Sequence, residues 1–404
     1  MSALICGSFA YDTIMVFKDR FKNHILPDKV HILNVAFHVP EMRREFGGCA
    51  GNIAYNLKLL GGEPVPMGTV GMDFAPYAEW MDFNGIDRTH VVALEGHYTA
   101  QAFITTDMDD NQITAFHPGA MDEAHCNSVS AANGITIGIV SPDGRQAMID
   151  HAQQFVEAGI PFVFDPGQGL PLFGGEDLRH FIDKATWVCV NDYESELLQE
   201  RTGLSPHEIA ELVDALIVTL GGEGSHIYTQ QQRIDIPPAK VREVVDPTGC
   251  GDAYRGGLLY GLLNGLGWET TGRIAALMGA IKIEEPGTQN HTLDPDTFRE
   301  RYRESFSVSL EKDSIFSDIG PADSYVGAIE ENRPNGELIQ ALADPAPIEV
   351  VLVPVRVKQR LVAFVLADDP GHTASQDHVD ALVTASRKAG VAFEALILRK
   401  KILS

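Results

Sequence analysis

Three features of the sequence predict an α/β protein with a doubly wound, mostly parallel sheet. Short β-branched runs alternate with helix-length segments, which is the order expected when helices cover both faces of a parallel sheet. Several runs end in small or polar residues, at the sheet edge where such folds bind ligands. The alternation stops near residue 305, which predicts a smaller α+β unit after it.

The alternation gives the expected elements in chain order. Strands are expected at residues 4–7, 135–141, 161–165, 187–191 and 216–221. Helices are expected at residues 51–60, 143–157, 192–202, 251–263 and 270–284. Residues 30–38 and 99–116 interrupt this order and predict a small antiparallel β lid over a site, with a plain edge hairpin as the alternative.

The chain changes in composition after residue 305, so domains are expected at 1–305 and 306–404. Two apolar strands are expected within residues 349–367, followed by a helix at 375–398. This strand–strand–helix unit resembles the second half of a GAF-type domain. Small-molecule sensing and dimerisation are both compatible with it.

Composition and charge exclude several classes of partner. The 404 residues carry 31 Lys and Arg against 56 Asp and Glu, a formal net charge of −25. A surface this acidic repels nucleic-acid phosphates and anionic lipid, so neither nucleic acid nor membrane is an expected partner. No apolar run reaches the ~18 residues of a membrane span, and no basic, cleavable leader is visible. Five scattered cysteines without a CxxC pair predict reduced thiols and a cytoplasmic location.

The strongest motif is the run Asp246-Pro247-Thr248-Gly249-Cys250-Gly251-Asp252, which follows a strand-like pair of valines and opens a helix. The two glycines let successive backbone amides point into one concavity, and the helix N-terminus adds about half a positive charge. The run therefore predicts a phosphate cradle made without lysine. Asp252, on the first helical turn, can accept the proton of an attacking hydroxyl during phosphoryl transfer. A simple helix N-terminal charge is the alternative.

Two motifs near the start of the chain can bind hydroxyl groups. Gly48 precedes a predicted helix that carries Asn52, whose amide both donates and accepts hydrogen bonds. Asp12 follows the first predicted strand, where a carboxylate can hold two neighbouring hydroxyls. The alternatives are a glycine turn with a capping Asn and a plain turn Asp.

Two later motifs suit a nucleotide and its metal. Asn191 and Glu194 are oxygen donors three residues apart, suited to Mg²⁺ directly or through its waters. A helix cap followed by a first-turn acid would give the same pattern. Thr219 precedes a glycine turn and can donate to phosphate oxygens, with a tight hairpin as the alternative.

Taken together and in this order, the motifs resemble the PfkB or ribokinase family of carbohydrate and nucleoside kinases over residues 1–305. Within the family the chain is most similar to bacterial adenosine kinases, on the stretches Arg20-Phe21…Leu26-Pro27…His31, Pro118-Gly119-Ala120-Met121, Asn191-Asp192-Tyr193-Glu194 and Gly287-Thr288-Gln289. The resemblance implies a ribokinase-like fold with a β lid, ATP and Mg²⁺ as cofactors, and a nucleoside or sugar substrate. It also implies a homodimer through the lid, for which the C-terminal module is a second candidate surface.

The resemblance assigns a role to each candidate residue. Asp252 would be the catalytic base, and the amides of Gly249, Cys250 and Gly251 would form an anion hole. The substrate would be held by Ser8, Asp12, Gly48, Asn52, Phe116 and Gln168. ATP would contact Asn191, Thr219, Gly221, Gly224 and Gln289, and Mg²⁺ would be organised by Asn191 and Glu194.

The resemblance is weakest where relatives hold the base. The lid position at which they stack an aromatic ring falls on Ala102, with Phe103 displaced by one, and the loss of such a ring removes ~1–3 kcal/mol of affinity. Ala36, Gly169 and Leu172 replace three other expected side chains. The expected function is ATP-dependent phosphorylation of a primary hydroxyl of a nucleoside, adenosine to AMP. The alternatives are a sugar kinase acting on ribose or fructose and a catalytically silent homologue with a regulatory role.

Overall fold

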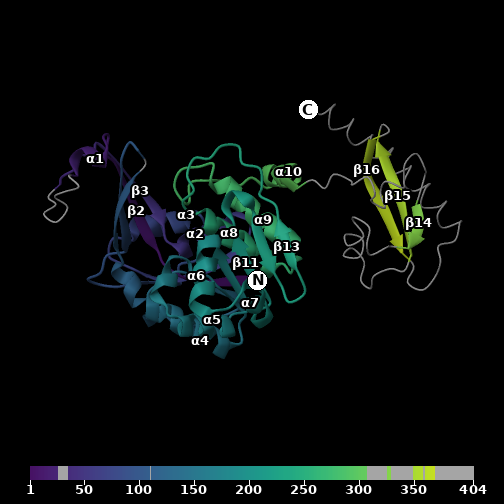
Figure 1. The fold of residues 1–404 in the computed structure, drawn as a ribbon, viewed down its shortest axis with the longest axis horizontal. Helices are drawn as coiled ribbons and strands as arrows, with labels where there is room; N and C mark the ends of the chain where they lie inside the picture. The colour runs from purple at the N-terminus through teal and green to yellow at the C-terminus, as the bar shows by residue number, and fades with distance from the viewer. Residues whose placement is uncertain (26–34, 110, 307–324, 329–348, 358–359, 369–404) are drawn as a thin grey trace. The chain divides into compact units, whose positions relative to one another are not determined.

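The computed structural model describes residues 1–25, 35–109, 111–306, 325–328, 349–357 and 360–368. The chain divides into two compact units, Met1–Ser307 and Val308–Ser404. The first unit contains every candidate site residue, and Figure 1 shows its central sheet with helices on both sides.

The first unit is built on a nine-stranded sheet in the described part of the chain. Its order is β13-β12-β11-β10-β9-β8-β1-β4-β5. The strands from β11 to β5 are parallel, and β12 and β13 are antiparallel additions at one edge. Their bounds are β1 Ser2–Cys6, β4 Glu63–Val70, β5 His90–Ala93, β8 Ile135–Val140, β9 Phe162–Phe164, β10 Trp187–Asn191, β11 Ala215–Thr219, β12 Ser225–Tyr228 and β13 Arg233–Ile236. The doubly wound, mostly parallel sheet predicted from the sequence is confirmed.

Alternation along β1 shows why both faces of the sheet are covered. Ala3 and Ile5 enter one hydrophobic cluster, whereas Leu4 and Cys6 enter another, and each of the four is at most 1% exposed. Successive side chains of a strand point to opposite faces, so a strand that is apolar throughout needs a helical layer on each side.

Two groups of helices supply these layers. The first cluster is completed by α2 (Cys49–Leu59), α3 (Ala75–Phe83) and α8 (Cys250–Leu263), with α9 (Trp268–Lys282) packed on α8. The second is completed by α4 (Arg145–Ala158), α5 (Gly175–Lys184), α6 (Asp192–Thr202) and α7 (Pro206–Leu212). The last helix of the unit, α10 (Pro295–Phe306), packs on α9 through Phe306.

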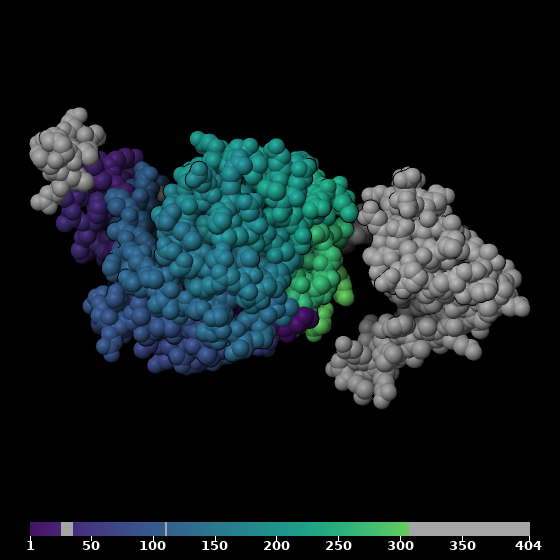
Figure 2. All heavy atoms as spheres, turned by 90° about the horizontal axis from the view of Figure 1, so that it is seen from below, coloured from purple at the N-terminus to yellow at the C-terminus, as the bar shows by residue number. Residues whose placement is uncertain are grey.

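A separate four-stranded sheet has the order β3-β2-β6-β7 and is called the lid, after the role predicted from the sequence. It comprises β2 Ala10–Val16, β3 Glu41–Gly47, β6 Ala100–Thr106 and β7 Gln112–His117, so the hairpin predicted at 99–116 is present. In the space-filling view the surfaces of the N-terminal strands and of the β6–β7 segment adjoin on one side of the unit (Figure 2).

The prediction of a second lid strand at 30–38 was wrong for the residues that the structure describes. Residues 35–38 form no strand, and 30–34 lie outside the described residues. The apolar character of this segment has another cause, because the Phe37 ring packs against Phe17 and Phe21 at 4.9 and 5.0 Å between ring centroids. The strands that pair in its place are β2 and β3.

The second unit contains a three-stranded antiparallel sheet in the order β14-β15-β16, with bounds Tyr325–Ala328, Glu349–Val357 and Arg360–Asp368. The predicted apolar hairpin is therefore present, with one further strand that the sequence did not indicate. The helix expected at 375–398 lies outside the described residues, and the resemblance to a GAF-type domain stays a prediction.

Candidate active site

The centre of the candidate site is the N-terminus of α8, where the Gly-x-Gly run folds as a turn (residues 246–251), called the anion-binding turn after the role predicted from the sequence. Gly249 precedes the helix with φ +79°, a backbone conformation that favours glycine, and a Cβ there would lie 3.0 Å from Thr288 Cγ2. The N–H groups of Gly251 and Asp252 lie in the first helical turn, where backbone donors have no acceptor within the helix. The turn therefore presents free donors and the positive end of the helix dipole to an anion.

Asp252 lies at this turn in contact with a neighbouring helix. Its Oδ2 accepts a hydrogen bond of 2.8 Å from Asn52 Nδ2, which brings α2 and α8 together although the two residues are 200 positions apart. Burial raises the pKa of Asp252 to about 6, and the bond from Asn52 opposes that shift. A carboxylate of this pKa is ionised at neutral pH and can still accept a proton from a substrate hydroxyl.

The Asn52 side chain is held by a buried hydrogen-bond chain. Its Oδ1 accepts from Gln289 Nε2 at 2.9 Å, and the same Nε2 donates to Tyr77 Oη at 2.6 Å. Trp80 Nε1 donates to Gln289 Oε1 at 2.9 Å. Both amide hydrogens of Gln289 are thus engaged, and the residue is 2% exposed. The structure places Gln289 behind Asn52, which does not favour the ATP contact expected for it from the sequence.

Asp12 lies within β2, not in a turn after the first strand as the sequence suggested, because β1 ends at Cys6 and a new strand begins at Ala10. Its carboxylate covers Gly47 of β3: a Cβ on Gly47 would meet Asp12 Oδ2 at 2.7 Å. Burial, followed by the charges of Asp246 and Glu45, raises the pKa of Asp12 to about 6. The charge of Asp246, the first residue of the anion-binding turn, therefore acts on the Asp12 carboxylate.

The register of the lid decides which aromatic ring faces Asp12. Asp12 pairs with Ala102 of β6, and Ala102 pairs with Phe116 of β7. Directly paired residues share a face of a sheet. Phe103 pairs with Thr13, and it lies on the opposite face. Ala102 is therefore on the Asp12 face, as expected, and Phe116, 53% exposed, places a ring on that face.

Gly48 and Ser8 fix the start of α2. Gly48 has φ +86°, and a Cβ there would lie 2.5 Å from Ser8 O and 2.6 Å from Ala10 N. Ser8 Oγ accepts from Cys49 N at 3.2 Å, and Ser8 O accepts from Ala50 N at 3.0 Å. These contacts place the backbone of two glycine-adjacent segments where a ligand can approach closely.

Asn191 and Glu194 form a capping box at the start of α6. Asn191 Oδ1 accepts from Glu194 N at 2.7 Å, and Glu194 Oε2 accepts from Asn191 N at 2.8 Å. The helix-cap alternative is therefore realised, and one carboxylate oxygen of Glu194 is already engaged. Within the described ranges, no group of three or more His, Cys, Asp or Glu could hold a metal. The donors fit Mg²⁺ bound through its waters better than Mg²⁺ held by direct protein ligands.

The remaining candidates lie at the carboxyl ends of later strands. Thr219 ends β11, and Gly221 begins a short turn with φ +56° that is exposed. Gly224 closes this turn with φ +95°, and a Cβ there would meet Ile236 O at 2.1 Å. Gln168 follows β9 and is exposed to solvent, in the turn that also contains buried Gly169. The sheet topology brings all of these to one edge, as parallel strands require.

Two further replaced positions are exposed. Ala36 is exposed in the irregular segment before β3, and Leu172 is exposed after β9, where its carbonyl accepts from Arg145 Nε at 3.2 Å.

Sequence reasoning missed two buried cations beneath the site. Arg255 is 5% exposed, and its Nη2 donates to Asp165 Oδ1 at 2.8 Å. Lys282 is 0% exposed and donates to the backbone of the anion-binding turn. Arg255 lies three residues after Asp252, so its spacing on α8 was a usable signal; Lys282 lies on another helix, and nothing in its local sequence marks it.

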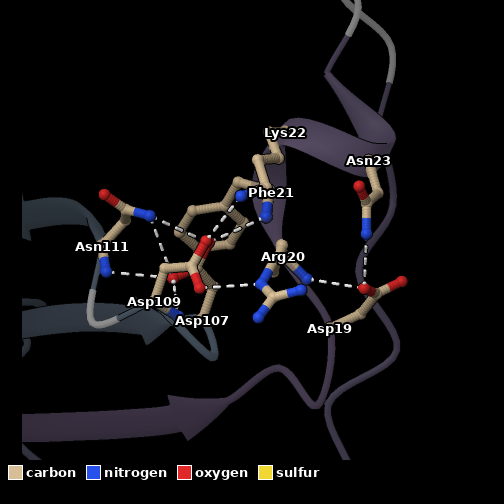
Figure 3. Close-up of polar contacts among 8 residues, drawn as sticks. All are labelled: Asp19, Arg20, Phe21, Lys22, Asn23, Asp107, Asp109 and Asn111. Carbon is tan, nitrogen blue, oxygen red and sulfur yellow. Dashed lines mark hydrogen bonds and ion pairs between the residues drawn. The ribbon is translucent and has the colours of Figure 1, made fainter.

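The tip of the lid is tied to α1 (Phe21–His24) by a polar cluster (Figure 3). Asp107 accepts hydrogen bonds from the backbone N–H groups of Phe21, Asp109 and Asn111 at 2.8–2.9 Å. Arg20 Nε lies 2.7 Å from Asp109 Oδ1. Segments far apart in the chain thus form one end of the lid.

Comparison with known proteins identifies the family. A model described as pfkB family carbohydrate kinase matches residues 16–295. The chain belongs to the PfkB family. This membership makes the protein a small-molecule kinase and agrees with the phosphate-binding geometry at the start of α8.

Several relatives are nucleoside kinases. The nucleoside kinase of Methanocaldococcus jannaschii is 33% identical over 270 residues, covering 66% of this chain and 89% of that protein. Its crystal structure, described as an archaeal member of the ribokinase family, has a TM-score of 0.68 at 29% identity and covers 75% of this chain and 98% of its own. The nucleoside kinase of Burkholderia thailandensis in complex with inosine has a TM-score of 0.69 at 51% identity, and the match covers 76% of this chain and 98% of that chain. The same enzyme in complex with ADP-inosine has a TM-score of 0.68 at 53% identity, and the match covers 76% of this chain and 96% of that chain.

The similarity establishes the ribokinase-like fold of the first unit. Among the described helices, none combines the length and apolar character that a membrane crossing would need.

Proposed function

We propose that this PfkB-family protein is an ATP-dependent nucleoside kinase that phosphorylates the 5′-hydroxyl of a purine nucleoside such as adenosine or inosine. The observation that carries the proposal is the Asn52–Asp252 pair at the anion-binding turn, together with Asp12 and Phe116 on one face of the lid. The relative crystallised with inosine is 51% identical, which favours a purine nucleoside as the acceptor.

The proposed reaction uses the residues as follows. Asp12 holds the ribose hydroxyls from the lid, and Phe116 stacks on the base. The 5′-oxygen attacks the γ-phosphorus, its proton passes to the Asp252 carboxylate, and the bond to the ADP oxygen breaks. The first-turn amides of α8 stabilise the charge that develops on the transferred group.

Mg²⁺, when bound with ATP, supplies charge neutralisation between the phosphates. The residues that would hold it are Asn191 and Glu194, through its waters, since Glu194 Oε2 is already bonded to the backbone. ATP would lie along the edge that carries Thr219, Gly221 and Gly224.

The test measures ATP consumption in the presence of Mg²⁺ with adenosine, inosine, other nucleosides, ribose and fructose. Turnover of a purine nucleoside is expected, and Asp252→Asn should lower kcat by about 10²–10⁴-fold while ADP binding stays nearly unchanged. Asp296→Asn is the matched control, because Asp296 is also a first-turn aspartate of a helix, α10, but its side chain is 90% exposed. Undiminished turnover by Asp252→Asn would remove this residue from the mechanism.

A sugar kinase is the second candidate. The observation that favours it is Ala102 on the Asp12 face, because its small side chain offers a nucleobase less contact than an aromatic ring would. Consumption of ATP with ribose or fructose and not with any nucleoside would support it. Consumption with none of the acceptors would support a silent homologue.

A further inference from the structure

Lys282 is a buried cation that the proposed reaction does not use. It is 0% exposed near the end of α9, and burial lowers its pKa. Its Nζ donates to two backbone carbonyls, Asp246 O at 2.8 Å and Glu285 O at 3.0 Å. Within the described residues it forms no ion pair with a carboxylate. The charges of Asp246 and Glu285 oppose the pKa shift caused by burial, but neither carboxylate is in ion-pair contact with the ammonium, so the two carbonyls are its direct partners.

Both carbonyls belong to segments that shape the anion-binding turn. Asp246 is the first residue of that turn, and its Oδ1 accepts from Thr248 N at 2.9 Å. Its Oδ2 accepts from Gly287 N at 2.9 Å, which ties the turn to the loop that begins at Glu285. Asp246 N in turn donates to Ile283 O at 3.0 Å, directly after Lys282. The ammonium therefore lies where the turn, the loop and the end of α9 meet.

The same loop extends to the other side of the site. Thr288 Oγ1 donates to Phe46 O, and Asn290 Nδ2 donates to Glu45 Oε2 at 2.9 Å, both on β3 of the lid. Gln289 between them holds Asn52, which bonds to Asp252. A displacement of this loop would therefore shift the turn, the lid and Asn52, the side chain that contacts the proposed catalytic base Asp252.

We propose that Lys282 is a built-in cation that holds the anion-binding turn in its phosphate-binding shape, in place of a bound monovalent ion. Two carbonyl dipoles that converge from different segments repel one another unless a cation lies between them, and carbonyl cages of this kind also suit K⁺. The ammonium supplies that charge covalently. Lys282 is thus a positioning residue acting through Asp246, and the kinase needs no added monovalent cation.

This inference rests on the proposed function for its activity readout, so the parent enzyme is assayed first with its best nucleoside. The reference buffer contains choline as its only monovalent cation. Parallel assays add K⁺ or NH₄⁺ to this buffer. The parent should show the same kcat in each buffer, within about twofold. A parent that requires K⁺ or NH₄⁺ would overturn the proposal, whatever the variants show.

Truncation of the side chain gives the decisive comparison. Lys282→Ala should lower kcat by at least about tenfold in choline, since a misplaced anion hole costs catalysis, and K⁺ or NH₄⁺ should restore much of it by filling the vacated space. Lys282→Met should lose activity without restoration, because its side chain fills that space and carries no charge. Lys184→Ala, which removes a lysine from α5 away from the turn, should match the parent. Parent-level kcat in choline for either Lys282 variant would refute the idea, as would a folded Lys282→Ala that no cation restores.

Thermal unfolding supplies a readout that requires no turnover. K⁺ or NH₄⁺ should raise the Tm of Lys282→Ala by more than it raises the Tm of the parent or of Lys184→Ala. This arm stands even if the parent phosphorylates no nucleoside, so the two proposals fail separately. If Lys282→Ala does not fold, Lys282→Met retains the apolar stem, and its kcat relative to the parent decides the outcome.

Discussion

Replacing Arg255 by methionine should destabilise the first unit. It should also move the acid limb of the pH profile of kcat/KM to higher pH. Arg255 is 5% exposed and Asp165 is 2% exposed, with Nη2 and Oδ1 2.8 Å apart. Glu194 Oε2 lies 3.9 Å from the same nitrogen, and Nη1 donates to Gly251 O at 3.3 Å. One guanidinium therefore joins the end of β9, the start of α6 and the first turn of α8.

The expected loss follows from what the variant leaves behind. Removal of one partner of a buried ion pair costs ~3–5 kcal/mol, because the other charge stays buried without compensation. The pKa of Asp165 is already raised by burial and is held down by Arg255, so the variant should raise it further. Arg255 also lowers the pKa of Asp252, which is about 6 in the parent.

The activity effect therefore has a definite sign. Asp252 must be ionised to accept a proton, so kcat/KM falls as pH decreases through its pKa. Without Arg255 that pKa rises, and the acid limb of the pH profile should move to higher pH. A purely structural role would lower stability but leave the position of this limb unchanged.

The assay combines urea or thermal unfolding with pH profiles of kcat/KM. Arg299→Met is the matched control, because Arg299 pairs with Asp296 on α10, where the two side chains are 66% and 90% exposed, and such surface pairs contribute about 1 kcal/mol or less. Arg255→Met combined with Asp165→Asn should recover part of the stability, since no carboxylate is then left unpaired there. Equal stability and an unmoved acid limb in Arg255→Met would contradict the role given to this residue.

Two further predictions concern Asp143 and Gly48. Asp143 is 4% exposed, its Oδ2 has no partner, and burial raises its pKa to about 8. Because the pKa is raised, the stability contributed by the neutral carboxyl is present below the unfolded-state pKa and is lost as pH rises through 8. The Tm of Asp143→Asn should therefore increase relative to that of the parent from pH 5 to 8, and the two Tm curves should run parallel above pH 8. A Tm difference that stays constant with pH would exclude this titration. Gly48→Ala should lower Tm by more than Gly61→Ala, because both have positive φ, which costs about 1–2 kcal/mol with a side chain, but only at Gly48 does the new Cβ meet backbone atoms. Equal losses in the two variants would show that the close approach at Gly48 is tolerated.

The main sheet could be predicted because continuous apolar runs in the sequence mark its buried strands. Strands such as β10 and β11 are apolar on both faces and end in Asn191 and Thr219, so both the fold and the edge that carries the site follow from the pattern. The turn at 246–252 was equally readable, since Gly249 has φ +79°, a backbone conformation that favours glycine.

The lid could not be assembled in the same way. β3 has four exposed residues in succession and β7 is exposed throughout, so neither strand shows the alternation that marks a half-buried sheet. The apolar residues before β3 instead serve a ring cluster around Phe37. Only the register in the structure shows that Ala102 and Phe116 share the face of Asp12.

Side chains that act through others were also beyond the sequence. The Gly287–Gln289 stretch was visible as a motif, but the direction of Gln289 toward Asn52 depends on the packing of α2, α3 and the loop. Asn191 and Glu194 show the converse, because two alternatives fitted their spacing and the structure forms the helix cap.

The net charge of −25 gives these buried cations their significance. An acidic protein that binds a polyphosphate needs positive charge close to the phosphates, and the sequence suggested that backbone amides, a helix N-terminus and Mg²⁺ would supply it. The structure shows Lys282 behind the first residue of the anion-binding turn and Arg255 beneath its helix. Neither is exposed, so neither offers an alternative docking point for stray anions, and both act through the backbone they hold. Both cations therefore support the backbone around the turn, and under the proposal for Lys282 the phosphate-binding shape depends on a charge that the ligand need not touch.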